Sequence, residues 1–135
     1  MKQDIVTLLR EMLNDAGLDD IIDSDLSNHS TISLNMKDDI PTINIKTEGD
    51  EVWVWARVGE YTPSTLAYCS EGVFSVMFNF NEDFFHLGQP CLYPVDGHLE
   101  LRALVKESFL ESSDLFGEVL EHFLNVLQEY CVVLK

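Results

Sequence analysis

Histidine and cysteine have the widest range of chemistry among the side chains of this chain. The histidines lie far apart, and no C-x2-C, H-x3-H or H-E-x-x-H spacing groups them as a metal site would require. His122 adjoins Phe123 in an amphipathic segment, which is typical of a structural histidine. We therefore expect no metal ion and no cofactor. The four positions are His29, His86, His98 and His122.

Nucleophilic and acid–base chemistry finds no better support. The chain has no G-x-S-x-G turn, and Cys69, Cys91 and Cys131 have no recognisable flanking signature. Cys69 and Cys131 fall on apolar faces of predicted helices, where cysteine behaves as a small hydrophobe. The paired aspartates at 19–20 and 38–39 lie in polar segments, where solvated charge is the ordinary interpretation. The sequence therefore does not predict an enzyme.

Two tryptophans, Trp53 and Trp55, make the segment 51–57 unusual. In a strand they project to one face, while Val52, Val54 and Ala56 project to the other. Such a strand has apolar side chains on both faces, so both must be covered. Either the first helix or a loop covers the tryptophans, or a binding partner does, at least in part. The sequence leaves these two interpretations open.

The hydrophobic periodicities predict eight elements in the order α-β-β-β-α-β-β-α. Helical spacing marks both ends of the chain and the segment after Pro63, and period-2 alternation marks the strands. This order indicates an α+β fold, with helices packed on a twisted antiparallel sheet. The predicted ranges are a helix from a cap at Asp4 to a stop at Gly17, strands 30–36, 41–45 and 52–58, a helix 63–80, strands 91–93 and 99–105, and a helix capped by Ser113 or Asp114 and reaching Cys131.

The composition of the chain further limits the classes of protein to which it can belong. The 135 residues, 46% of them apolar, fit a single domain spanning 1–135. A net charge of −16 repels nucleic acid. Charges recur through residues 1–16, so we expect no signal peptide, and the apolar runs fall short of the roughly 20 residues of a membrane span. Three widely spaced cysteines fit the reducing cytoplasm.

A string of strand motifs resembles the InvB/SpaK family of type III secretion chaperones, in class I, subclass IB. The opening and closing helices extend the resemblance over nearly the whole chain. The motifs, in order, are His29-Ser-Thr-Ile-Ser-Leu34, Ile40-Pro-Thr-Ile-Asn-Ile45, Val52-Trp-Val-Trp-Ala56 and Leu99-Glu-Leu-Arg-Ala-Leu-Val-Lys106.

The resemblance implies a cytoplasmic homodimer without catalytic activity. It would bind the N-terminal chaperone-binding region of several effectors in extended form, partly by strand addition, and hand them to the secretion ATPase. We expect the effector to contact Leu8, Leu9, Met12, Ile43, Ile45, Trp53 and Trp55. By carry-over from the family, the dimer interface would include Leu66, Cys69, Val73, Met77, Leu92 and Leu101.

Two other classes remain open. A small enzyme or ligand-binding domain would need a pocket near Trp53 and Trp55 with convergent polar groups. An adaptor module would instead bind a folded partner.

The acidic surface is expected to keep the protein soluble and to steer basic client segments toward it.

Overall fold

The computed structural model describes residues 5–16, 31–36, 39–79, 84–85 and 89–134. The elements follow the predicted order, α-β-β-β-α-β-β-α, and the α+β class is confirmed. A short 3-10 helix, Glu107–Leu110, is additional. The elements are α1 (Ile5–Ala16), β1 (Ile32–Leu34), β2 (Ile43–Glu48), β3 (Glu51–Glu60), α2 (Pro63–Met77), β4 (Cys91–Val95), β5 (His98–Leu104) and α3 (Ser113–Val133).

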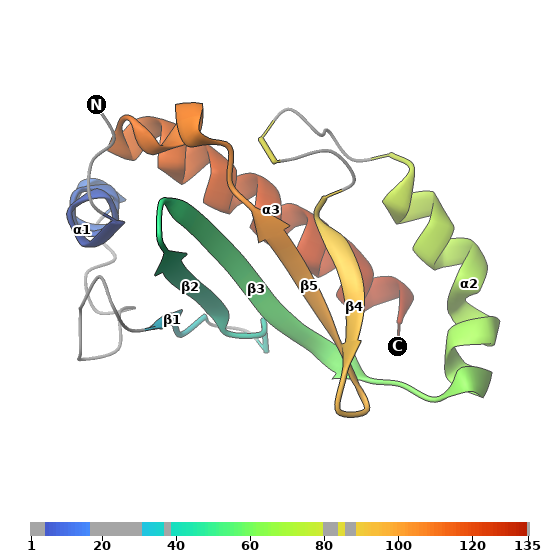
Figure 1. The fold of residues 1–135 in the computed structure, drawn as a ribbon. Helices are drawn as coiled ribbons and strands as arrows, with labels where there is room; N and C mark the ends of the chain where they lie inside the picture. The colour runs from blue at the N-terminus through green and yellow to red at the C-terminus, as the bar shows by residue number, and fades with distance from the viewer. Residues whose placement is uncertain (1–4, 17–30, 37–38, 80–83, 86–88, 135) are drawn as a thin grey trace.

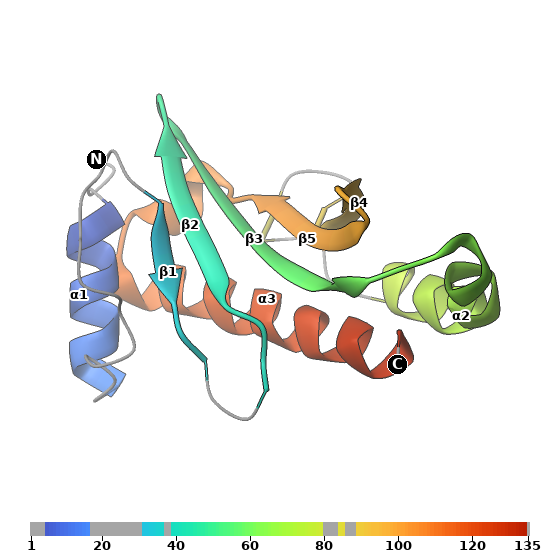
Figure 2. The same ribbon diagram turned by 90° about the horizontal axis from the view of Figure 1, so that it is seen from below.

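The five strands form one antiparallel sheet in the order β1-β2-β3-β5-β4. The first three strands make a meander, and β5 then pairs with β3, which leaves β4 at the edge. Pro94 lies in this edge strand, where its missing N–H leaves no interior ladder bond unmade. Helix α3 crosses one face of the sheet, with α1 beside β1 and α2 beyond β4 (Figures 1 and 2).

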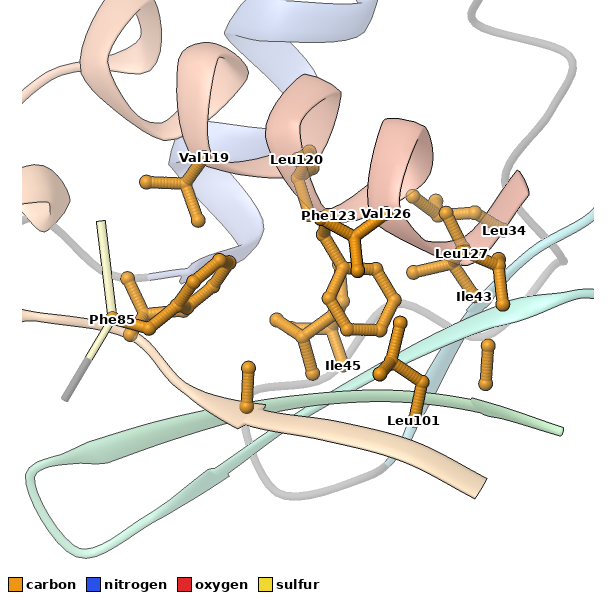
Figure 3. Close-up of a cluster of buried hydrophobic side chains, with 14 of the residues drawn as sticks. Leu34, Ile43, Ile45, Phe85, Leu101, Val119, Leu120, Phe123, Val126 and Leu127 are labelled. Carbon is orange, nitrogen blue, oxygen red and sulfur yellow. The ribbon is translucent and has the colours of Figure 1, made fainter. Parts of the chain in front are cut away.

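The core lies between α3 and the sheet (Figure 3). Phe116, Phe123 and Leu127 on α3 are fully buried against alternate residues of the strands, such as Ile45 and Leu101. Helix α1 adds the apolar face predicted from its helical spacing, with Leu8 and Leu9 fully buried. All helices described therefore pack on one side of the sheet or at its ends, and none of the described helices covers the other face, which we call the open face.

Several boundaries differ from the predictions. Ser112 caps α3, rather than Ser113 or Asp114: its backbone is extended, and its Oγ accepts a hydrogen bond from the Leu115 N–H at 3.2 Å. Helix α2 ends at Met77, and β2 begins at Ile43. The predicted cap at Asp4, the stop at Gly17 and Phe80 lie outside the described residues.

Gly72, which weakens the helical propensity of α2, marks the closest approach of α2 to α3. A Cβ atom at this position would lie 2.9 Å from Val133 Cβ, inside van der Waals contact. The Gly72→Ala substitution is therefore expected to lower the free energy of unfolding by about 1–2 kcal/mol, because overpacking outweighs the gain of roughly 1 kcal/mol in helix propensity. Chemical denaturation measures this change. A Gly72→Ala variant that is more stable than the wild type would contradict the close packing.

Candidate binding surfaces

The two tryptophans lie on the open face of the sheet, as the alternation in β3 predicts. Val52, Val54 and Ala56 are buried toward the helices, and Trp53 and Trp55 are half-buried on the opposite side. No helix of the described chain lies over this face (Figures 1 and 2). The first of the two interpretations was that the first helix or a loop covers the tryptophans. The described part of α1 does not cover them.

The open face is hollowed into a groove of about 600 Å³. Its floor is formed by the tryptophans of β3, and its sides by residues of β2, β4 and β5. The volume fits a short stretch of extended chain. The lining consists of Thr31, Lys46, Glu48, Glu51, Trp53, Trp55, Gln89, Cys91, Tyr93 and Arg102.

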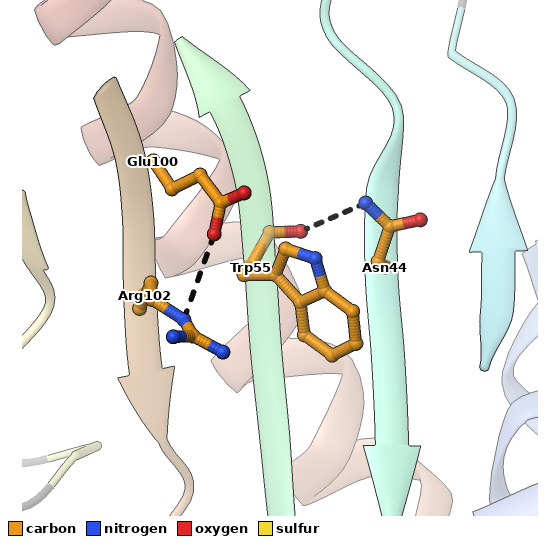
Figure 4. Close-up of polar contacts among 4 residues, drawn as sticks. All are labelled: Asn44, Trp55, Glu100 and Arg102. Atoms are coloured by element: carbon orange, nitrogen blue, oxygen red, sulfur yellow. Dashed lines mark hydrogen bonds and ion pairs between the residues drawn. The ribbon is translucent and has the colours of Figure 1, made fainter. Parts of the chain in front are cut away.

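Trp55 is fixed by neighbours on both adjoining strands (Figure 4). The Asn44 side-chain amide donates to the Trp55 carbonyl at 3.5 Å, and Ser33 Oγ donates to Asn44 Oδ1 at 2.9 Å. On the other side, the Arg102 guanidinium lies 5.9 Å from the centroid of the Trp55 ring, and Arg102 Nε lies 3.7 Å from Glu100 Oε1. The hydrogen bonds from β1 and β2 hold the backbone of Trp55, and Arg102 on β5 is the neighbour that lies beside its ring.

Most other residues expected to contact an effector lie inside the protein. Leu8, Leu9, Ile43 and Ile45 belong to the hydrophobic core, and none of them exceeds 2% exposure. Met12 is partly buried, and its side chain faces Gly117 of α3. These residues support the fold, so only the tryptophan pair of the predicted set lies on the groove.

The residues expected at the dimer interface also divide into buried and partly exposed side chains. Cys69 and Val73 are buried on the inner face of α2, and Leu101 is buried in the sheet. Because these three side chains already have partners within the chain, they are not available to a second copy as the structure stands. The remaining three, Leu66, Met77 and Leu92, are partly exposed.

The outer face of α2 carries large apolar side chains that the sequence interpretation missed. Tyr68, Phe74 and Phe78 are 89%, 52% and 77% exposed, and the rings of Phe74 and Phe78 stack with centroids 6.0 Å apart. We call these three residues the α2 outer face. A helix with apolar residues on all sides is expected to be buried on all sides. This distribution in the sequence of α2 could have indicated that its outer face binds a partner.

Two residues of the segment 79–89, Phe84 and Phe85, contribute to the core. Phe85 is fully buried and forms a bridge with Val105. The rings of Phe84 and Phe85 lie 4.9 and 5.9 Å from the His122 imidazole, measured between centroids. His122 thus has the structural position expected from its neighbour Phe123. His29, His86, Asp19, Asp20 and Asp38 lie outside the described residues.

Groups that could bind a metal are not clustered in the described part of the chain. Cys69, Cys91 and Cys131 are not joined by disulfide bonds. Helices that are long and apolar enough to cross a membrane are likewise not found among the described residues.

Tyr130 on α3 is the titratable group most affected by its surroundings. Burial, followed by the charges of Cys91 and Glu129, raises the pKa of Tyr130 from 10.0 to about 12. Its hydroxyl has no hydrogen-bond partner within the described residues. Because the folded-state pKa lies above the unfolded one, the neutral phenol contributes its full stability below about pH 10, and this contribution is lost as the pH rises through about 12.

The Tyr130→Phe variant is therefore expected to be at least as stable as the wild type at pH 7, because it removes an unpaired buried hydroxyl. Between pH 10 and about 12 its free energy of unfolding should fall less steeply. Urea denaturation at several pH values, compared between the two proteins, isolates this residue from the other groups that titrate there. A variant clearly less stable at pH 7 would show that the hydroxyl has a partner in solution.

Comparison with known proteins gives a consistent result. The sequence pattern of the Invasion protein B family matches residues 17–96. The chain is 30% identical over 129 residues to the surface presentation of antigens protein SpaK of Salmonella typhimurium, strain LT2, and to the protein of the same name from Salmonella typhi. Each alignment covers 94% of this chain and 93% of the relative.

Proposed function

Because this chain belongs to the Invasion protein B family, the InvB/SpaK family of type III secretion chaperones, we propose that it binds the N-terminal chaperone-binding regions of effector proteins. Residues 1–135 would form a single chaperone domain acting in the cytoplasm without catalysis. It would keep several effectors unfolded, soluble and competent for secretion, and help deliver them to the secretion ATPase.

The observation that carries this proposal is the open groove with its two half-buried tryptophans. Ordering one residue of an extended segment costs roughly 1–2 kcal/mol of backbone entropy. At about 25 cal/mol per Å², each residue must bury on the order of 40–80 Å² of apolar surface in compensation. Charge alone does not supply this, whereas the faces of Trp53 and Trp55 do.

Hydrogen bonding to the client's backbone would supplement the apolar contacts. The sheet ends in β1 and β4, and an added strand would bond to either edge whatever the client's sequence. Since Pro94 removes one donor from β4, we favour the β1 edge. Sequence-independent bonding suits a chaperone that serves several effectors.

We further propose that the protein is a homodimer, held together through the α2 outer face. Three large exposed aromatic side chains, two on α2 and one at its C-cap, form the kind of patch that marks an interaction surface. The sequence-based expectation placed the dimer interface on the inner face of α2, with Cys69 and Val73. We now propose the opposite face of the same helix as the interface. The two proposed surfaces lie on different elements, so a dimer would leave the groove of each copy open.

Light scattering tests both parts of the proposal. The purified protein is expected to have a mass near 31 kDa, twice the 15.4 kDa of one chain. Co-expression with the N-terminal hundred or so residues of a secreted effector should yield a soluble complex. A monomer that ignores this segment would contradict the proposal. Binding to a folded domain in its place would favour an adaptor, and binding of a small molecule would favour a ligand-binding domain.

A further inference from the structure

The open face of the sheet differs in charge from the chain as a whole. The chain has 24 acidic and eight basic residues, yet three of the eight, Lys46, Arg57 and Arg102, lie on the tryptophan face. Their strand positions show this, because Lys46 pairs with Trp53, Arg102 pairs with Trp55, and Arg57 follows Trp55 by two residues. Three glutamates, at 48, 51 and 100, share the face by the same alternation. The groove is thus close to neutral on a strongly anionic protein.

The charge that this face presents to a ligand is positive at Arg102. Its side chain is 40% exposed, whereas that of its counter-ion Glu100 is 15% exposed. Arg102 Nε lies 3.7 Å from Glu100 Oε1, and this nitrogen is itself buried without a hydrogen-bond partner among the described residues. The exposed part of the Arg102 side chain lines the groove, with the guanidinium 5.9 Å from the centroid of the Trp55 ring.

We propose that Trp55 and Arg102 form one platform, which selects client segments carrying a carboxylate next to an apolar side chain. The apolar group packs on the indole, and the carboxylate accepts hydrogen bonds from the guanidinium, whose planar fork matches it. Lys46, beside Trp53, is paired with Glu48 at 3.3 Å, so Arg102 is the basic group on which the platform depends. This inference rests on the proposed function and names the client chemistry that the groove favours.

The platform and the acidic surface act over different distances. The net charge of −16 steers basic segments from afar, but salt screens it beyond about 8 Å under physiological conditions. A carboxylate in contact with Arg102 is governed by its immediate neighbours. Acidic residues in a client are therefore tolerated in this groove even though the rest of the surface repels them.

Fluorescence quenching tests the local charge on the protein alone. Trp53 and Trp55 are the only tryptophans of the chain, so its indole emission reports on the groove. The ratio of the iodide to the caesium quenching constant is expected to exceed the ratio measured for free N-acetyltryptophanamide. An Arg102→Gln variant should lower the iodide quenching constant by about two- to fivefold, as for a half-exposed ion pair, without changing quenching by neutral acrylamide.

Arg10→Gln is the matched control, because it removes the same charge from an exposed position on α1. It should leave the iodide constant unchanged. An iodide-to-caesium ratio in the wild type equal to or below that of free N-acetyltryptophanamide would overturn the platform, since a uniformly anionic surface concentrates the cation.

A pair of small probes tests the selectivity. 4-Phenylbutyrate and 4-phenylbutylamine share an apolar body and differ in the sign of their charge. The carboxylate should shift the emission at a concentration about two- to fivefold lower than the amine, and Arg102→Gln should remove this preference. Equal binding, preference for the amine, or no binding of either probe would overturn the proposal. Neither test uses an effector, so a failure here is distinguishable from a failure of effector capture.

Discussion

Replacing Trp53 and Trp55 together by alanine is expected to abolish capture of an effector segment while the protein stays folded. Aromatic residues at the centre of an interface contribute about 2–4 kcal/mol each, so the double variant should lose at least a hundredfold in affinity. Both side chains are half-buried on the open face, so the free energy of unfolding should fall by much less than the roughly 3–5 kcal/mol expected for each buried aromatic residue, and the melting temperature should fall only slightly. Co-purification and thermal melts measure the two effects.

Val54→Ala is the matched control, because Val54 lies between the tryptophans in sequence and faces the core. The Val54→Ala substitution should lower the melting temperature, but the molecules that remain folded should still bind the effector segment. If the tryptophan variant instead melts far below Val54→Ala, the indoles belong to the core. If it keeps its melting temperature and still captures the segment, the groove is not the client site.

The fold was predictable because its local patterns agree with one another. Period-2 alternation in 52–58 and 99–105 and helical spacing before Gly17 each allow one kind of element. Boundaries were less predictable because they depend on single contacts. Ser112 caps α3 because its backbone is extended, while the neighbouring Ser113 already has helical geometry.

The pairing of β5 with β3 was beyond the sequence interpretation. β5 follows α2 and β4 in the chain, yet it lies between β3 and β4 in the sheet. No local pattern encodes this non-local order. The contact of Arg102 with Trp55 follows only from that pairing, so the basic side of the groove became visible with the topology.

The surfaces were harder to predict because hydrophobicity does not distinguish a core position from an interface position. The apolar stripe of α1 was assigned partly to the effector, but Leu8 and Leu9 complete the core against α3 and the sheet. On α2 the stripe of Cys69 and Val73 packs inward for the same reason. What identifies an interface is apolar surface that remains after the chain has packed, and this requires the three-dimensional arrangement.

That remaining surface leads to the second large prediction: replacing Phe74 and Phe78 by serine should convert the dimer to a monomer. Stacked and more than half exposed, these rings have no role in the core of one chain. Losing them should cost about 2–4 kcal/mol each at an interface, which weakens a micromolar or tighter dimer by several orders of magnitude. Light scattering should show the mass falling from about 31 kDa to 15.4 kDa at an unchanged melting temperature of the monomeric unit.

Val73→Ala, on the inner face of the same helix, separates this effect from damage to α2. Val73 packs within the chain, so the Val73→Ala substitution should lower the free energy of unfolding. The molecules that remain folded should still form dimers. A Phe74 and Phe78 variant that still scatters as a dimer would assign the interface to another surface. The inner and outer faces of α2 thus predict opposite outcomes: one substitution reduces stability and retains association, whereas the other reduces association and retains stability.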